Sequence, residues 1–366
     1  MIVDRNSIQS RALAMLRFPL AALIVLLHTG YEGASTDVTY YIAHYVIGNI
    51  VTLSVPAFFF MSGYLFFMGK EPFSLSVYVG KMRKKIKGLL IPYLLWNIIA
   101  YLLGIAYKMA KDHTIGEVMP WNLISIFWAQ GEGITGTSIL GYTYPAIVSP
   151  ASGVLWFIRD LFIMMLCSPI IYAIIKRIKW GVFPLLFFLN VFKLGIPFVG
   201  FSLPAVTFFS LGSFFSIYQK DVFDWVKNRN IFWLGTFLLI VIVCVCTEIF
   251  GLSLYGIDNF LHHVVGVFAC FSLAYYFASR EHALIRWNLR LAETSFWIYC
   301  FHATMIIWLL NKEVGYFLND IQYVGYTLSY IYMFVARLIE CVIAFYILKK
   351  LYPSVLGVLI GGRLNK

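Results

Sequence analysis

The side chains most able to do chemistry in this sequence are a few ionisable residues inside long apolar stretches. They are His28, Arg159, Asp160, His302, Arg337 and Glu340. Charge in such surroundings is costly and usually serves a function. Arg17 and His28 are eleven residues apart, which is almost three helical turns, so both should lie on one face, about 16 Å apart along the axis. One helical stripe would then carry a cation and a possible base.

Two pairs of charged residues lead to opposite predictions. Arg159 and Asp160 are neighbours, and neighbouring side chains point about 100° apart on a helix. We therefore expect that they do not pair with each other and that each needs its own partner. Arg337 and Glu340 are three residues apart, a spacing at which a helix brings opposite charges together. We interpret them as a structural pair.

Polar residues also interrupt two aromatic runs. Ser295, Tyr299 and His302 recur at spacings of four and three, which places them on one face of a helix. Ser62 and Gly63 break the run PAFFFMSGYLF, and glycine would let another helix or a ligand approach the backbone there. Helix packing and a hydrogen-bonded core histidine are the alternative interpretations.

The elements that position these residues follow from the composition. Of 366 residues, 61% are apolar and only 12% are charged, and the mean hydropathy is +0.82. Soluble domains contain about 25% charged residues, so this chain could not cover a water-facing surface. The composition excludes a soluble enzyme, a disordered chain and a nucleic-acid binder. Aromatic residues, at 18%, fit a membrane protein whose Trp and Tyr gather at the interfaces.

The apolar windows predict an all-α integral membrane protein with about ten transmembrane helices and one domain over residues 1–366. A membrane-spanning helix needs about 20 residues. The candidate spans are 13–30, 46–68, 89–107, 155–176, 180–192, 198–218, 231–250, 261–278, 294–310 and 326–348. The fifth window is short and contains Pro184. We find no internal repeat.

The positions of the 28 Lys and Arg residues orient these spans. Cytoplasmic loops of membrane proteins are enriched in both residue types. With a cytoplasmic N-terminus, the exceptions are Lys108, Lys111, Lys193 and Lys312 on outer loops, and Arg159 and Arg337 within spans. Every other basic residue falls on the inner side, so we predict that both chain ends are cytoplasmic.

Two connections attract further attention. Residues 74–88 are denser in basic side chains than topology requires, and we predict an amphipathic helix on the inner membrane surface. Residues 108–154 form the longest outer connection. Loops of this length are usually functional or disordered, and we interpret this one as a cap. The six cysteines lie in apolar segments without metal-ligand spacing, so we expect no metal site.

Five segments together resemble the acyltransferase 3 family of integral-membrane acyltransferases. They are the Arg17-to-His28 spacing, FFFMSGYLF at 58–66, the basic stretch from Arg83 that ends in IPYLLWN at 91–97, LWFIRDL at 155–161 and SFWIYCFH at 295–302. They occur in the family order and extend over nearly the whole chain. Many members carry an acidic residue shortly before the first Arg, whereas this chain has Ala12 to Leu16 there. The chain resembles the stand-alone class, without the fused esterase-like domain.

The resemblance implies transfer of an acyl group, often acetyl, from cytosolic acyl-CoA to a hydroxyl of a cell-surface or lipid-linked glycan. The implied location is the cytoplasmic membrane of a bacterium, as a multi-pass protein in contact with lipid. Acyl-CoA is then the donor substrate, and neither a metal nor nucleic acid is an expected partner.

The resemblance also implies roles for individual residues. His28 would be the general base, and Arg159 and Trp156 would stabilise the tetrahedral oxyanion. Arg17, Arg83 and the lysines that neighbour Arg83 would bind the phosphates of acyl-CoA, whose arm would run along the first span toward His28. The remaining residues expected on the donor path are Ser62, Gly63 and His302.

Other classes of protein fit part of this pattern. A transporter or flippase for a lipid-linked saccharide would also contain buried charges, although such proteins often show inverted repeats. An acyltransferase of another architecture, acting on lipid or protein, would share a catalytic histidine. A membrane scaffold or sensory module would not depend on His28.

Overall fold

The computed structural model describes residues 5–34, 36–69, 73–111, 123–129, 134–137, 141–252, 254, 256–280, 282–321 and 324–364. Helices dominate, and each of the ten predicted windows contains helix. In the described residues, six helices are long and apolar enough to cross a membrane, or seven if one bent pair counts as a single span. The chain is therefore a multi-pass membrane protein, while the number ten and the cytoplasmic ends stay predictions.

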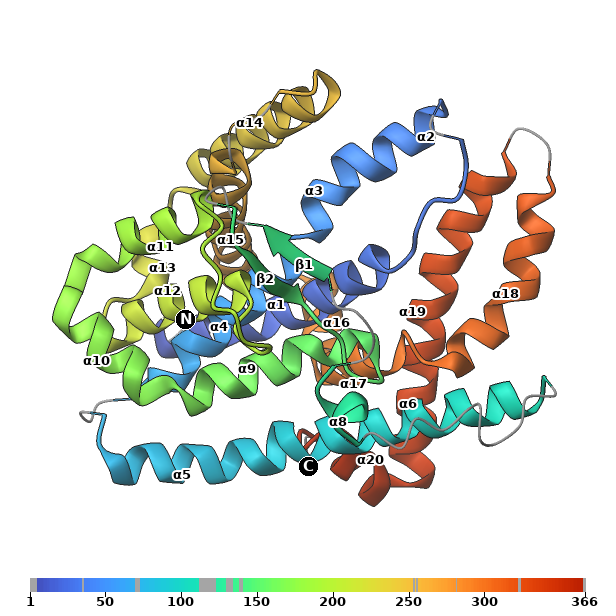
Figure 1. The fold of residues 1–366 in the computed structure, drawn as a ribbon, viewed down its shortest axis with the longest axis horizontal. Helices are drawn as coiled ribbons and strands as arrows, with labels where there is room; N and C mark the ends of the chain where they lie inside the picture. The colour runs from blue at the N-terminus through green and yellow to red at the C-terminus, as the bar shows by residue number, and fades with distance from the viewer. Residues whose placement is uncertain are drawn as a thin grey trace.

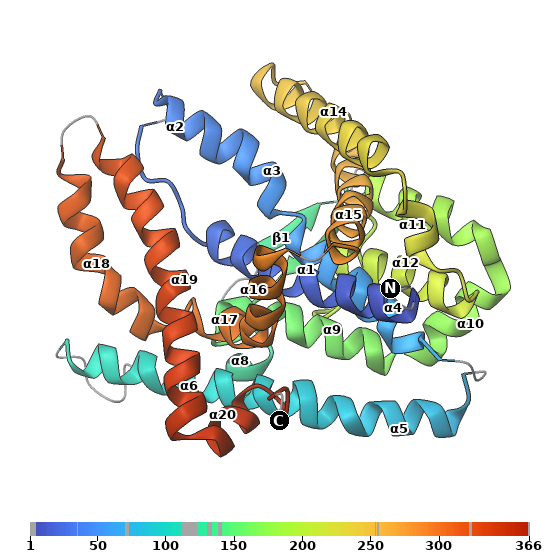
Figure 2. The ribbon, with the colours of Figure 1, turned by 180° about the vertical axis from the view of Figure 1, so that it is seen from behind.

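The first helix forms the axis of the molecule. It is α1 (Arg5–Leu27), which contains Pro19. It packs against α4 (Ser54–Phe67), α15 (Ile257–Ala278) and α17 (Ser295–Phe301), as Figures 1 and 2 show from opposite sides. These neighbours come from distant parts of the sequence, so α1 brings residues of several segments together along its length.

The tightest helix packing joins α4 to α12 (Leu203–Ile217). A Cβ on Gly63 would overlap the backbone oxygen of Phe209, and a Cβ on Gly212 would overlap that of Phe60. Small residues allow such close backbone approach where apolar side chains alone give little drive for association. Buried phenylalanines, Phe60 and Phe215 among them, fill the space around this contact.

The basic segment 74–88 is helical, as predicted, and continues into the next span. Helix α5 (Leu75–Lys85) passes through a π-helical segment, Ile86–Leu90, into α6 (Ile91–Met109). The two form one rod beneath the rest of the molecule in Figure 1, next to α9 (Trp156–Leu166) and α20 (Pro353–Leu359). This arrangement of helices does not test the prediction that α5 lies on a membrane surface.

Two predicted spans are not straight. The window 155–176 bends by 63° between α9 and the segment that contains α10 (Ser168–Ile178) and α11 (Val182–Val191). Pro169 stands at the start of α10, where proline cannot donate the backbone hydrogen bond that a continuous helix needs. The window 294–310 is broken between α17 and α18 (Met305–Asn319). His302 therefore lies at a helix break and not in mid-helix.

The connection 108–154 contains local structure where it is described. Helix α8 (Leu123–Phe127) is followed by strands β1 (Ile134–Thr137) and β2 (Thr143–Ile147), which pair antiparallel with Thr137 opposite Thr143. The all-α prediction did not include this small ribbon. Residues 112–122, 130–133 and 138–140 of the predicted cap lie outside the described residues.

Two helical hairpins extend from the central helices in Figures 1 and 2. One is α14 (Asn230–Ile249) with α15, and the other is α18 with α19 (Gly325–Leu351). The remaining elements are α2 (Val38–Tyr41), π-helical Ile42–Ile47, α3 (Gly48–Val51), α13 (Val222–Val226), α16 (Ala283–Leu291) and the 3-10 turns Gly153–Leu155, Lys179–Gly181 and Ala292–Thr294.

Candidate active site

Two histidines from distant parts of the chain meet at the end of α1. His28 follows the last turn of that helix, and His302 follows the last turn of α17. Nε2 of His302 lies 3.3 Å from Nδ1 of His28, and the ring centroids are 5.1 Å apart. His302 is 2% exposed, whereas His28 lines a cavity. The structure therefore brings His302, expected on the donor path, into contact with His28.

The hydrogen-bond partners assign the protons on these rings. Nδ1 of His302 lies 3.0 Å from the backbone oxygens of both Ile298 and Tyr299, so this nitrogen carries the proton because a carbonyl can only accept. Nδ1 of His28 is 2.9 Å from the oxygen of Ile24 and carries a proton for the same reason. Nε2 of His28 then holds a lone pair and can act as a base.

A mainly polar cavity of about 160 Å³ opens beside His28; we call it the His28 cavity. The segment after α1 and the α18–α19 hairpin form its walls. Its residues are His28, Thr29, Gly30, Glu32, Trp308, Lys312, Gly315, Tyr316, Asn319, Tyr326, Ser329, Tyr330, Met333 and Arg337. Because α18 starts at the break after His302, the break places this hairpin over the histidine pair.

Arg337 is the cation closest to the histidines. Its Nη1 donates to the backbone oxygen of His28 at 3.0 Å. The predicted partner, Glu340, instead accepts from Nδ2 of Asn311 at 2.7 Å. Nε of Arg337 is buried and has no hydrogen-bond partner among the described residues. The interpretation of Arg337 and Glu340 as a direct ion pair is therefore wrong, because each side chain reaches a closer partner on another helix.

A second, larger cavity of about 430 Å³ lies at the other end of α1; we call it the Arg17 cavity. Arg17 and Ser62 line it, as the sequence led us to expect for a donor site. Most of its other walls are apolar. They are Ala14, Phe58, Met61, Leu65, Leu89, Phe157, Ile158, Leu161, Met165, Leu289, Ala292 and Phe296, with Ser295 and Tyr299 from α17.

Two further cations join Arg17 in this cavity, one from the expected group of lysines near Arg83 and one that was not expected. They are Lys85, at the end of α5, and Arg363. Gly361 and Gly362 have φ of 66° and 74°, a backbone region that favours glycine, and this turn brings Arg363 back from α20. The signals in the sequence were the basic run 81–87 for Lys85 and the C-terminal basic cluster for Arg363.

The charges of the Arg17 cavity are unbalanced. Its one carboxylate, Glu293, accepts two hydrogen bonds from Nζ of Lys349, at 2.9 and 2.8 Å. Among the described residues, no ion pair is found for Arg17, Lys85 or Arg363. Burial, with the positive charge of Arg17 nearby, lowers the pKa of Arg363 to about 10. Three cations without an ion-pair partner among the described residues, gathered in one cavity, are an arrangement that suits an anionic ligand.

An apolar block separates the two cavities. The stripe of α1 that starts at Arg17 and ends at His28 contains Ala21 and Val25 between them, and both are fully buried. They pack with residues of α17, α18 and α19, namely Ile298, Ile307 and Cys341; we call these five residues the apolar block. Where we expected the acyl-CoA arm to run along this stripe, the structure has packed apolar side chains that line neither cavity.

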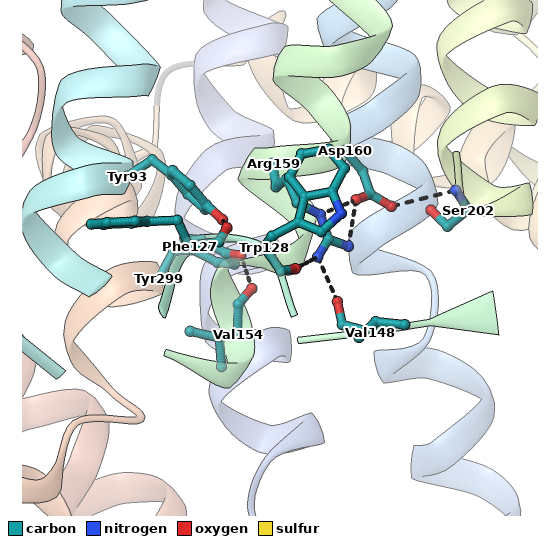
Figure 3. Close-up of polar contacts among 9 residues, drawn as sticks. All are labelled: Tyr93, Phe127, Trp128, Val148, Val154, Arg159, Asp160, Ser202 and Tyr299. Carbon is teal, nitrogen blue, oxygen red and sulfur yellow. Dashed lines mark hydrogen bonds and ion pairs between the residues drawn. The ribbon is translucent and has the colours of Figure 1, made fainter. Parts of the chain in front are cut away.

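Arg159 is held by the connection 108–154 and by its own neighbour (Figure 3). Its Nη2 lies 2.8 Å from Oδ1 of Asp160 and its Nη1 donates to the oxygens of Trp128, at 2.5 Å, and Val148, at 2.7 Å. The prediction that Arg159 and Asp160 do not pair is wrong, because the long arginine stem turns its head back to the adjacent carboxylate. Oδ2 of Asp160 also accepts from the backbone N–H of Ser202 at 3.4 Å.

The structure places several predicted site residues away from both cavities. Arg159 and Trp156 line neither cavity, and the Trp156 ring packs against Phe59, 6.4 Å away. Gly63 has a packing role at α12, and Arg83 is exposed on α5 without lining the Arg17 cavity. Within the described residues, no group of three or more His, Cys, Asp or Glu is placed to hold a metal ion.

Comparison with known proteins places the chain in a class. Residues 11–346 match the acyltransferase 3 family model, described as an acyltransferase domain. The match covers nearly the whole chain, so the protein belongs to this family and is a membrane acyltransferase, as the sequence resemblance predicted. No curated protein and no solved structure matches the chain.

Proposed function

We propose that this protein transfers an acyl group, most simply acetyl, from cytosolic acyl-CoA to a hydroxyl of a cell-surface or lipid-linked glycan in a bacterial cytoplasmic membrane. The observation that carries the proposal is the stripe of α1. One of its ends lies in a cavity with three uncompensated cations, and the other is a histidine with a free basic nitrogen. This arrangement suits an anionic donor on one side and a hydroxyl acceptor on the other.

The Arg17 cavity is the proposed donor site. Acyl-CoA combines an anionic nucleotide end with a long, less polar arm, and the cavity combines Arg17, Lys85 and Arg363 with mainly apolar walls. Guanidinium groups bind phosphate through paired, charge-assisted hydrogen bonds. The positive-inside pattern predicts that this end of α1 faces the cytoplasm, the side on which the proposed donor, cytosolic acyl-CoA, is available.

The proposed reaction uses His28 as the general base. Nε2 of His28 takes the proton from the acceptor hydroxyl as its oxygen attacks the thioester carbonyl. The C–O bond forms, the C–S bond breaks, and the same proton returns to the departing CoA thiolate. His302 accepts from Nδ1 of His28, so it fixes the tautomer that exposes the lone pair.

Arg337 is the proposed donor for the tetrahedral oxyanion. We expected Arg159 and Trp156 in this role, but the donors of Arg159 are used by Asp160 and two backbone oxygens. Arg337 lines the cavity of His28 and touches its backbone. A fixed cation beside the reacting carbonyl stabilises developing negative charge.

Transfer also requires a conformational step. The apolar block fills the space between Arg17 and His28, so the thioester reaches His28 only when these side chains separate. Helix α17 and the break after it are the elements placed to move, because His302 to Thr304 lie outside regular helix. Lid and gate motions of this kind set the turnover rate of many enzymes.

The test is acetyl-CoA turnover by membranes that contain the protein. Wild-type membranes should release CoA and label glycan from [14C]acetyl-CoA, and His28→Ala should reduce the rate about a hundredfold or more. His282→Ala is the matched control, because His282 is exposed at the start of α16. Glycan export that depends on the protein without acetyl-CoA consumption would contradict the proposal and favour a transporter.

A further inference from the structure

The His28 cavity contains more hydrogen-bonding groups than its own contacts use. Asn319 donates through Nδ2 to Oε2 of Glu32 at 3.3 Å. The Oδ1 atom of Asn319 is buried and has no partner among the described residues. Buried polar groups are normally paired, so this oxygen points to a ligand that supplies a hydroxyl or amide donor.

Aromatic side chains surround these polar groups. Tyr316, Tyr326 and Tyr330 line the cavity together with Trp308. Tyrosine and tryptophan present a flat apolar face and one polar atom each. A ligand with an apolar ring face and several hydroxyls at its edge matches such a lining.

The balance of charge favours an uncharged ligand. Lys312 lines the cavity and is paired at 3.2 Å with Glu313, which does not line it. The Nζ atom of Lys312 also lies 5.3 Å from the centre of the Trp308 ring. The carboxylate of Glu32 is in the same cavity as the Arg337 cation. The charged residues of this cavity are therefore of both signs, unlike the three cations of the Arg17 cavity.

The size of the cavity suits the insertion of a single ring. Its volume is about 160 Å³, far less than the 430 Å³ of the Arg17 cavity. His28 lines the same space, so a hydroxyl of a ring bound there can reach its basic nitrogen.

We propose that the His28 cavity binds the acceptor, and that it takes one uncharged sugar ring of the glycan. Two neighbouring hydroxyls of the ring bond to Glu32 and to Oδ1 of Asn319, its apolar face packs against the tyrosines, and a third hydroxyl meets His28. The α18–α19 hairpin is thus the element that selects the acceptor. This inference rests on the proposed function and adds to it the place and chemistry of acceptor recognition.

The experiment measures acceptor use and donor binding separately. Membranes of the host strain, lacking the native copy and complemented with each variant, receive [14C]acetyl-CoA, and label in the glycan is counted. The same variants are purified in detergent, and the rise in melting temperature caused by CoA is measured. The variants are Glu32→Gln and Asn319→Ala. Glu248→Gln is the control, because Glu248 is exposed on α14 and lines neither cavity.

We expect Glu32→Gln and Asn319→Ala each to reduce glycan labelling about tenfold or more. The rise in melting temperature with CoA should equal that of the wild type, which also shows that these variants fold. Glu248→Gln should label glycan at the wild-type rate. Labelling within about twofold of wild type in both variants would overturn the inference, as would a parallel loss of the CoA effect. A wild-type protein without labelling or CoA effect would instead overturn the proposed function.

Discussion

At the scale of single residues, the proposed chemistry depends on a contact between two histidines that are 274 positions apart. Each histidine is oriented by backbone oxygens of its own helix end, Ile24 for one and Ile298 with Tyr299 for the other. The pair therefore resembles a base and its orienting partner, with a neutral imidazole where many enzymes use a carboxylate.

Replacing His302 should slow acyl transfer without weakening donor binding. His302→Ala removes the acceptor for Nδ1–H of His28, so the tautomer is less well fixed, and we expect the rate to fall about tenfold to a hundredfold. His302→Gln should recover part of the rate, since its amide oxygen can accept the same bond. The measurements are acetyl transfer and CoA-induced stabilisation. Full activity in His302→Ala would contradict this role.

The rate should also depend on pH in a defined direction. A protonated imidazole has no lone pair to accept the acceptor proton. Transfer at saturating acyl-CoA should therefore be constant at high pH and fall on the acid side, by about tenfold per pH unit once His28 is mainly protonated. A pH series on membranes checks this, and a rate that rises on acidification would contradict a histidine base.

Arg159 has a structural role in this account, so its loss should act first on stability. Breaking a buried ion pair typically costs about 3–5 kcal/mol. Arg159→Met leaves Asp160 buried without its cation and releases the bonds to Trp128 and Val148. We expect a clearly lower melting temperature in detergent. An unchanged melting temperature with lost activity would instead restore Arg159 to the reaction.

At the scale of elements, two glycines and the helix break after His302 shape the site. Gly63 and Gly212 let α4 and α12 approach, which fixes one wall of the Arg17 cavity. The break after His302 turns α18 away from α17 and creates the His28 cavity between α18 and α19. Apolar windows show where helices form, but they do not show a break whose cause is packing against other helices.

The α4–α12 contact can be tested with a pair of glycine substitutions. Gly212→Leu would drive its side chain into the backbone of Phe60, so the folded yield and melting temperature should fall. Gly235→Leu, in α14, is the control because no heavy atom lies within 4 Å of a Cβ built there. Similar behaviour of the two variants would show that the close approach does not matter for stability.

At the scale of the whole molecule, α1 runs from the cation-lined Arg17 cavity past the apolar block to the His28 cavity. The helical stripe from Arg17 to His28 was predictable, because helix periodicity alone places both on one face. The lysines near Arg83, which include Lys85, were also expected there, but Arg337 and Arg363 were not, since they arrive through long-range packing. The pairing of Arg159 with Asp160 escaped local reasoning because a flexible side chain can turn back along its own helix.

The cation cluster provides a direct test of the donor site. Arg17→Gln, Lys85→Gln and Arg363→Gln should each weaken CoA binding, by about tenfold for the arginines, because each removes a charge-assisted bond to phosphate. Arg83→Gln is the matched control, since Arg83 is exposed and does not line the cavity. The measurement is CoA-induced stabilisation at low and high salt, and equal losses in all four variants would point to general surface charge.

The most direct test of the central claim is the mass of the surface glycan in four strains. These carry no protein, the wild type, His28→Ala or His282→Ala. We predict a mass increment of one acyl group in the wild-type and His282→Ala strains only, with equal amounts of protein in all three expressing strains. The same increment in the His28→Ala strain would contradict a reaction centred on His28, and no increment in any strain would contradict acylation of the glycan.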